Sequence, residues 1–237
     1  MTDGARFLLD GVEVPFRAGQ TIIEAADDAG LYIPRLCHLP GLVPYGGCRV
    51  CSVRANGRMV ASCVHPAGAD MVVESDTEEL NQHRRLLLEM LFVSGNHFCP
   101  ICERSGNCEL QALGYRFGIA APLLEFQYPK REVDASHPDI LIDHNRCILC
   151  GRCVRASRDL DHKEIFGFVG RGVHRRLAVA SGTRLGDTAC EVTDRALDAC
   201  PVGALLRKRV GFTVPVGRRR FDRQVIGAEI ASREGAP

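Results

Sequence analysis

Short alternations of hydrophobic and polar residues fill the first 75 positions of the chain. Residues 7–9 and 12–14 flank Asp10-Gly11, a residue pair typical of tight hairpin turns. Residues 49–55 and 58–63 flank Asn56-Gly57 in the same way, and residues 71–73 are typical of a closing strand. The pattern therefore predicts a small β-rich unit with two hairpins and one further strand.

Helical signals lie within this unit and after it. Thr21 and Glu24 have the spacing of a capping box, which predicts a short helix that Gly30 would end. Apolar residues recur mostly every three or four positions across residues 77–94, which predicts the clearest helix of the chain. Another helix is expected over residues 108–117.

The remaining pattern predicts a mixed unit behind a connector. Residues 121–137, with three prolines in or beside them, are typical of a connecting segment. Between residues 140 and 206 we expect two helices and a strand pair. The expected positions are residues 154–160 for the first helix, 166–169 and 176–179 for the strands, and about Thr188 to Cys200 for the second helix.

Composition makes the cysteines the most informative residues. The chain has 237 residues, 12 of them cysteine, and a formal net charge of +1. Its first ten residues lack the apolar stretch of a signal peptide, and its longest apolar run, residues 86–93, is too short to span a bilayer. We therefore expect a cytoplasmic protein with no membrane insertion. In that reducing compartment, clustered cysteines indicate metal or redox sites and not disulfides.

The first group of four cysteines has the spacing C-x10-C-x2-C-x11-C, with two glycines directly before the second cysteine. A [2Fe–2S] cluster needs four thiolates at two irons, and the C-x2-C pair lets one tight loop supply two of them. A structural zinc site with four thiolate ligands is the main alternative. The group predicts a [2Fe–2S] cluster held by Cys37, Cys48, Cys51 and Cys63.

The second group has three cysteines, whereas the four irons of a [4Fe–4S] cluster need four ligands. They are Cys99, Cys102 and Cys108, and His97 is the obvious fourth ligand. An imidazole in place of a thiolate removes negative charge near the iron and raises the reduction potential, as it does in Rieske centres. His83, on the preceding predicted helix, is the reserve candidate.

The third group is a C-x2-C-x2-C triplet completed by a distant cysteine that precedes proline. This arrangement is typical of a [4Fe–4S] cluster, because the triplet surrounds three corners and the distant residue reaches the fourth. The predicted ligands are Cys147, Cys150, Cys153 and Cys200. Cys190 belongs to no group and is expected to be a buried free thiol.

Other kinds of site have no signal in the sequence. It contains no dinucleotide-binding glycine motif after a strand, no P-loop and no nucleophile elbow, so we expect no catalytic residue in this chain. Basic residues cluster at 207–209 and 218–220, without stacking aromatics or a recognition motif. These segments indicate an arm that contacts an acidic partner subunit, and no nucleic-acid binding is expected.

The order of the three groups resembles the N-terminal iron–sulfur part of the large subunit of respiratory complex I, and related segments of NAD-linked hydrogenases and formate dehydrogenases. The segments that carry it are residues 32–37, 47–51, 99–111, 147–153 and 200–204. Residues 95–100 and 208–219 are most similar to the small iron–sulfur (diaphorase) subunit of soluble NAD-reducing [NiFe] hydrogenases.

Pattern and resemblance together imply an α+β protein of three cluster modules and a tail. A β-grasp, ferredoxin-like [2Fe–2S] domain is expected over residues 1–76, and a helical [4Fe–4S] module with three Cys ligands and one His over 77–136. A ferredoxin-like [4Fe–4S] module with only Cys ligands would span 137–209, and a basic partner-binding tail would span 210–237.

The resemblance also implies a function. The chain would relay electrons within a multi-subunit oxidoreductase in which hydrogen oxidation is coupled to NAD⁺ reduction. Its partners would be a flavin- and NAD-binding diaphorase subunit and the small and large [NiFe] hydrogenase subunits, which would carry the FMN, the NAD and the NiFe centre. Alternatives are the same relay in an NAD-dependent formate dehydrogenase or a complex I-like NADH dehydrogenase, and a zinc-stabilised scaffold.

Overall fold

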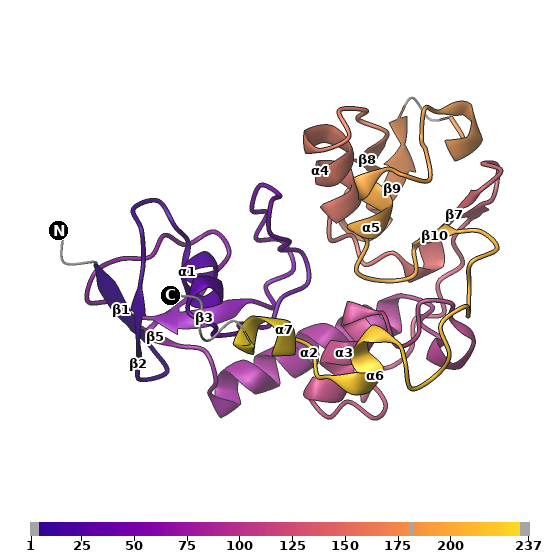
Figure 1. Ribbon diagram of the computed structural model, residues 1–237. Helices are drawn as coiled ribbons and strands as arrows, with labels where there is room; N and C mark the ends of the chain where they lie inside the picture. The colour runs from indigo at the N-terminus through magenta and orange to yellow at the C-terminus, as the bar shows by residue number, and fades with distance from the viewer. Residues whose placement is uncertain (1–4, 181–182, 233–237) are drawn as a thin grey trace.

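The N-terminal unit is built on a five-stranded mixed sheet in the order β2-β1-β5-β3-β4 (Figure 1). The structure is a computed structural model, which describes residues 5–180 and 183–232 of the chain. β1 runs parallel to β5, and the other neighbours are antiparallel. The strands are β1 (Arg6–Leu9), β2 (Val12–Pro15), β3 (Ser52–Ala55), β4 (Arg58–Ala61) and β5 (Val72–Glu74).

Both predicted hairpins are confirmed. Their turn residues, Asp10 and Gly11 in one and Asn56 and Gly57 in the other, all have positive φ angles between 45° and 84°. Two successive residues with positive φ give a turn whose twist matches that of the flanking strands. The sequence signal was reliable here because these turns depend only on their own residues.

The short helix α1 (Ile22–Asp28) begins as predicted. The Glu24 carboxylate accepts hydrogen bonds from the Thr21 backbone N–H and hydroxyl, at 2.9 and 2.8 Å. Gly30 has a φ of +75° just beyond the helix end. Apolar residues of α1 and of the sheet form a core that belongs to this unit, and it includes Phe7, Val14, Ile22, Ile23, Val53, Cys51 and Cys63.

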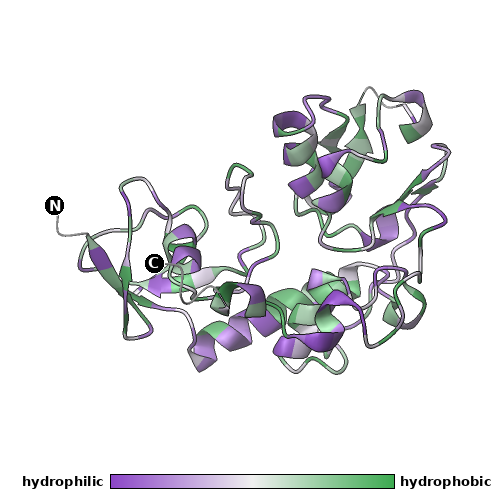
Figure 2. Ribbon diagram, viewed as in Figure 1, coloured by the Kyte–Doolittle hydropathy of each residue, from purple (hydrophilic) through white to green (hydrophobic). Residues whose placement is uncertain are grey.

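The longest helix of the described residues, α2 (Glu78–Ser94), starts at Thr77, whose side chain accepts a hydrogen bond from the Leu80 N–H. Its hydropathy changes along its length, from a hydrophilic first half to a hydrophobic second half that lies near α3 (Glu109–Arg116) (Figure 2). Within residues 5–180 and 183–232, no helix is both long and apolar enough to cross a membrane.

The third unit contains a strand pair, a three-stranded sheet and two helices. The predicted strands are confirmed as β8 (Phe166–Val169) and β9 (Arg176–Val179), and the first predicted helix is α4 (Arg152–Asp159). The sheet has the order β10-β7-β6. Its strands are β6 (Val133–Asp134), β7 (Ile140–Asp143) and β10 (Leu205–Arg207). Short 3-10 helices of this unit are η2 (His144–Arg146), η3 (Gly172–His174) and η5 (Leu185–Asp187), and another, η1 (Cys99–Ile101), lies in the second unit.

The predicted second helix of this unit is much shorter than expected. α5 covers only Arg195–Asp198, so the prediction of a helix from about Thr188 was wrong. The Asp161 carboxylate accepts hydrogen bonds from the backbone N–H groups of Arg195 and Ala196, at 2.8 and 3.0 Å, and this fixes the helix start. A cap supplied from 34 residues away leaves no local sequence signal.

The C-terminal segment returns along the second unit. Its helices are α6 (Arg220–Arg223) and α7 (Ala228–Ala231) (Figure 1). The Phe221 N–H donates to the Gly106 carbonyl oxygen at 2.8 Å, and Arg116 of α3 donates to the Ile226 carbonyl oxygen, just before α7, at 3.4 Å. Several tail arginines pair with carboxylates of this same chain. The pairs are Arg207 with Asp198, Arg209 with Asp139, Arg219 with Asp222 and Arg220 with Glu229. Much of the positive charge that the sequence suggested for a partner is thus neutralised internally.

Candidate iron–sulfur sites

The four cysteines of the first group converge beside the end of the first sheet. The loop after α1 brings Cys37 to Cys48, and the Cys37 N–H donates to the Cys48 sulfur at 3.3 Å. Hydrogen bonds from the Cys48 and Cys63 thiols lower the pKa of Cys37 to about 2. Cys63 also donates to Cys51, which lowers the pKa of Cys51 to about 6. Four sulfurs that share protons at such short range suit a group that binds them as thiolates.

Buried arginines hold the backbone on either side of this first site. Arg84 of α2 donates to the carbonyl oxygens of Val50 and Ser52, at 3.1 and 2.9 Å, and these two residues flank Cys51. Arg155 of α4 donates to the carbonyl oxygen of Cys37 at 2.5 Å. The other two units therefore help to fix the ligand loops of the first.

The second group surrounds a small cavity that His97, Cys99, Cys102 and Cys108 all line. Burial, reinforced by the cations Arg146 and Arg131, lowers the pKa of His97 to about 4, so the imidazole is neutral. Its Nε2 atom is buried and has no hydrogen-bond partner among the described residues. A neutral ring with a free buried nitrogen beside three thiols fits a fourth ligand of a metal cluster.

Gly95 leaves the space that the His97 ring occupies. A Cβ atom at Gly95 would lie 2.4 Å from His97 Nε2, a distance that requires the ring to move. His83, the reserve ligand, is on α2 and does not line this cavity. Of the two histidines, the structure therefore brings only His97 to the three cysteines.

The third group lines another small cavity, to which all four of its cysteines contribute. Leu149 and Gly151 have φ angles of 54° and 70°, which turn the chain sharply around Cys150. Burial raises the pKa of Cys150 to about 12. Thiols in such surroundings lose their protons only when a cation binds them, so these residues also fit an iron cluster.

The second and third cavities share a wall. Val202 and Ala204 line the third cavity, and Gly203 between them lines the second. A Cβ atom at Gly203 would lie 3.1 Å from the Cys102 sulfur. The segment after Cys200 is therefore the boundary between the two sites, and a side chain at position 203 would require Cys102 to shift by a few tenths of an ångström.

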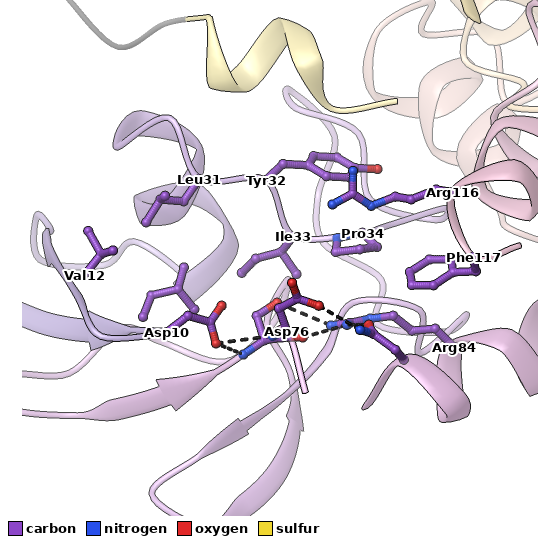
Figure 3. Close-up of a pocket in the computed structure, with 13 residues that line it drawn as sticks. Asp10, Val12, Leu31, Tyr32, Ile33, Pro34, Asp76, Arg84, Arg116 and Phe117 are labelled. Carbon is purple, nitrogen blue, oxygen red and sulfur yellow. Dashed lines mark hydrogen bonds between the residues drawn. The ribbon is translucent and has the colours of Figure 1, made fainter. Parts of the chain in front are cut away.

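Cys190 and one further cavity both lie away from these sites. Cys190 is buried and lines neither of the two cysteine cavities, as expected for a free thiol. The further cavity, of about 180 Å³, is lined by no cysteine. Some of its polar groups pair with one another, since Asp10 accepts from the Ser75 N–H at 2.6 Å and Arg84 donates to the Ser75 carbonyl oxygen at 2.6 Å (Figure 3).

Three segments match known iron–sulfur families. Residues 4–78 match the 2Fe-2S iron-sulfur cluster binding domain. Residues 84–122 match the iron-sulfur binding region of NADH-ubiquinone oxidoreductase-G, and residues 137–206 match the ferredoxin-like domain of NADH-quinone oxidoreductase subunit 3. The chain thus has domains of both the 2Fe-2S and the 4Fe-4S type.

Relatives cover nearly the whole chain. The NAD-reducing hydrogenase HoxS subunit gamma of Cupriavidus necator is 37% identical over 227 residues, which are 95% of this chain and 97% of that protein. The mitochondrial NADH-ubiquinone oxidoreductase 78 kDa subunit of Candida albicans is 35% identical over 208 residues, but this chain spans only 28% of its length. A chain in a crystal structure of H2-reduced NAD⁺-reducing [NiFe]-hydrogenase superposes with a TM-score of 0.89, at 54% identity, over 92% of this chain and 93% of that one. The chain belongs to the family of the gamma subunit of NAD-reducing hydrogenases, as its sequence predicted.

Proposed function

We propose that this chain is the electron-relay subunit of an NAD-reducing hydrogenase. It would connect a [NiFe] hydrogenase module, with small and large subunits, to a diaphorase subunit that binds FMN and NAD. Hydrogen oxidation on one side would then drive NAD⁺ reduction on the other. One observation carries the proposal. The chain brings together three groups of Cys or Cys and His side chains, and the third group lies next to each of the other two.

Each group would hold one cluster, and each bound cluster would supply a one-electron carrier. The [2Fe–2S] ligands would be Cys37, Cys48, Cys51 and Cys63. One [4Fe–4S] cluster would be held by His97, Cys99, Cys102 and Cys108, and the other by Cys147, Cys150, Cys153 and Cys200. The corresponding modules would be a β-grasp domain over residues 1–76, a helical module over 77–136 and a ferredoxin-like module over 137–209, followed by the tail.

The chain's own residues would keep the three sites apart at fixed separations and away from water. The third site is central in this arrangement. Its helix α4 contacts the ligand loop of the first site, because Arg155 donates to Val43 and Cys37 carbonyl oxygens at 2.6 and 2.5 Å. Its Cys200 segment forms one wall of the second site through Gly203. Electrons would therefore pass between the first and second sites by way of the third.

The same relay in a formate dehydrogenase or a complex I-like enzyme is the second candidate. Its support is the identity of 32–35% to complex I subunits, of which this chain spans 28–30%. The hydrogenase is favoured because that relative is matched over 97% of its length. A zinc-stabilised scaffold has no support among these relatives.

The test is hydrogen-driven NAD⁺ reduction by the complex that copurifies anaerobically with this chain, with its subunits identified by mass. We expect NADH to form, and to stop in Cys200→Ala while the complex still assembles. Cys190→Ala is the matched control, since Cys190 is equally buried and lines no cysteine cavity, and it should keep the activity. A brown complex that ignores hydrogen but reduces NAD⁺ with formate would establish the second candidate instead.

A further inference from the structure

Helix α4 begins with a buried cation in the middle of the third group. Arg152 stands between Cys150 and Cys153 in sequence and is only 2% exposed. A buried arginine is tolerated when its donors are paired, because an unpaired charge in the interior costs much free energy. The partners of Arg152 therefore indicate what the residue does.

These partners come from the other two sites. Arg152 donates to both carboxylate oxygens of Glu109, at 2.8 and 2.7 Å, and to the carbonyl oxygen of His38 at 2.8 Å. Glu109 directly follows Cys108 of the second site, and His38 directly follows Cys37 of the first. One planar guanidinium thus connects residues adjacent to a proposed ligand of each of the three sites. No other contact of the described residues links all three in this way.

The charge of Arg152 also reaches the third site itself. Arg152 comes two residues after Cys150 and directly before Cys153, in the first turn of α4, so its side chain starts from the ligand loop of the third site. Its Nε–H group is buried and has no partner among the described residues. A cation with a free donor beside a site stabilises whatever negative charge is added there.

We infer that Arg152 is a positioning residue that fixes the three sites relative to one another and raises the reduction potential of the third. This rests on the proposed function, since the third site must hold a [4Fe–4S] cluster. The two roles are separable by substitution. Lysine keeps the charge but cannot bridge Glu109 and His38 with a planar fork, whereas methionine keeps most of the length and removes both the charge and the donors.

The experiment compares Arg152→Met, Arg152→Lys and Glu109→Gln in the anaerobically purified complex. Arg158→Met is the matched control. Arg158 is on the same helix and half-exposed, and within the described part of the chain it pairs only with the adjacent Asp159. The readouts are cluster potentials from redox titration monitored by electron paramagnetic resonance, and the magnetic coupling between the clusters.

We expect Arg152→Met to lower the potential of the third cluster and to weaken its coupling to both neighbours. Arg152→Lys should keep the potential near the wild-type value but weaken the coupling, and Glu109→Gln should raise the potential, since it removes the opposing negative charge. Arg158→Met should change neither readout.

Unchanged potential and coupling in Arg152→Met would overturn the inference. If Arg152→Met does not assemble, an unshifted potential in Glu109→Gln would overturn it equally. Absence of a third cluster in the unmodified complex would instead refute the proposed function.

Discussion

Buried arginines recur wherever a cysteine loop meets another part of the chain. Arg35, Arg84, Arg152 and Arg155 are each at most 6% exposed, and each donates to backbone carbonyl oxygens within or beside a proposed ligand loop. Loops leave many carbonyl oxygens without partners in regular structure, and a guanidinium offers five donors in one plane. At the residue scale, buried arginines therefore hold the backbone of the cysteine loops in place.

The identity of the fourth ligand at the second site gives the first prediction. His97→Cys should keep a cluster there and lower its reduction potential by on the order of 100 mV, since a thiolate replaces a neutral imidazole. His97→Ala should lose that cluster or leave it labile. Redox titration followed by electron paramagnetic resonance measures both, and His83→Ala is the control. A potential unchanged in His97→Cys would show that His97 is not a ligand.

Gly203 gives a second prediction at this scale. Gly203→Ala places a methyl group 3.1 Å from the Cys102 sulfur, so Cys102 must shift by a few tenths of an ångström. We expect the spectrum of the second cluster to change more than that of the third, because the added methyl group points toward Cys102. Ala204→Gly, on the other side of the wall, is the comparison. Equal changes in both clusters would contradict this assignment.

At the scale of elements, α2 stabilises the first unit through Arg84. Arg84→Met would leave the carbonyl oxygens of Val50, Ser52 and Ser75 without these donors. Each unsatisfied buried group costs about 1–3 kcal/mol, so the total loss should be about 3 kcal/mol or more. The midpoint in urea at which the [2Fe–2S] absorption disappears should fall accordingly. Arg58→Met, an exposed site on β4, should leave that midpoint unchanged.

How far the sequence predicts an element depends on where its partners lie. The Asp10-Gly11 and Asn56-Gly57 turns and the Thr21 capping box were predictable because each is closed by residues a few positions apart. The start of α5 was not predictable, because its cap comes from Asp161, 34 residues earlier.

The candidate sites follow the same rule. The groupings came from spacing within loops, whereas the shared wall at Gly203 and the bridge from Arg152 connect residues that are 43 to 114 positions apart.

At the scale of the whole molecule, residues 5–180 and 183–232 form two hydrophobic cores, and these do not follow the three cysteine groups. One core lies within the first unit. The other extends across the second and third units and the tail, and it includes Leu36, Leu42 and Val50 from the first unit's ligand loops. The first unit therefore supplies its own sheet and helix core, but the rest of the molecule holds its cluster loops.

A fragment of residues 1–78 tests this division. It keeps the first core, so we expect it to fold, with the circular dichroism of a mixed α/β domain. It loses the contacts of Leu36, Leu42 and Val50 and the hydrogen bonds from Arg84 and Arg155, so its cluster should be lost at least several-fold faster than in the full chain. The decay of visible absorption under chelator measures this. Equal lifetimes would mean that the loops need no support from the other units.

The thin wall at Gly203 has a consequence for how electrons are stored. Electron exchange slows steeply with distance, and the segment of residues 202–204 lines both the second and the third cavity. Two carriers so close would share electrons faster than any substrate arrives or leaves, and would act as one reservoir of two electrons. Nicotinamide accepts two electrons at once as a hydride. With two neighbouring one-electron carriers, the second electron would thus already be in the chain when the first has passed to the flavin.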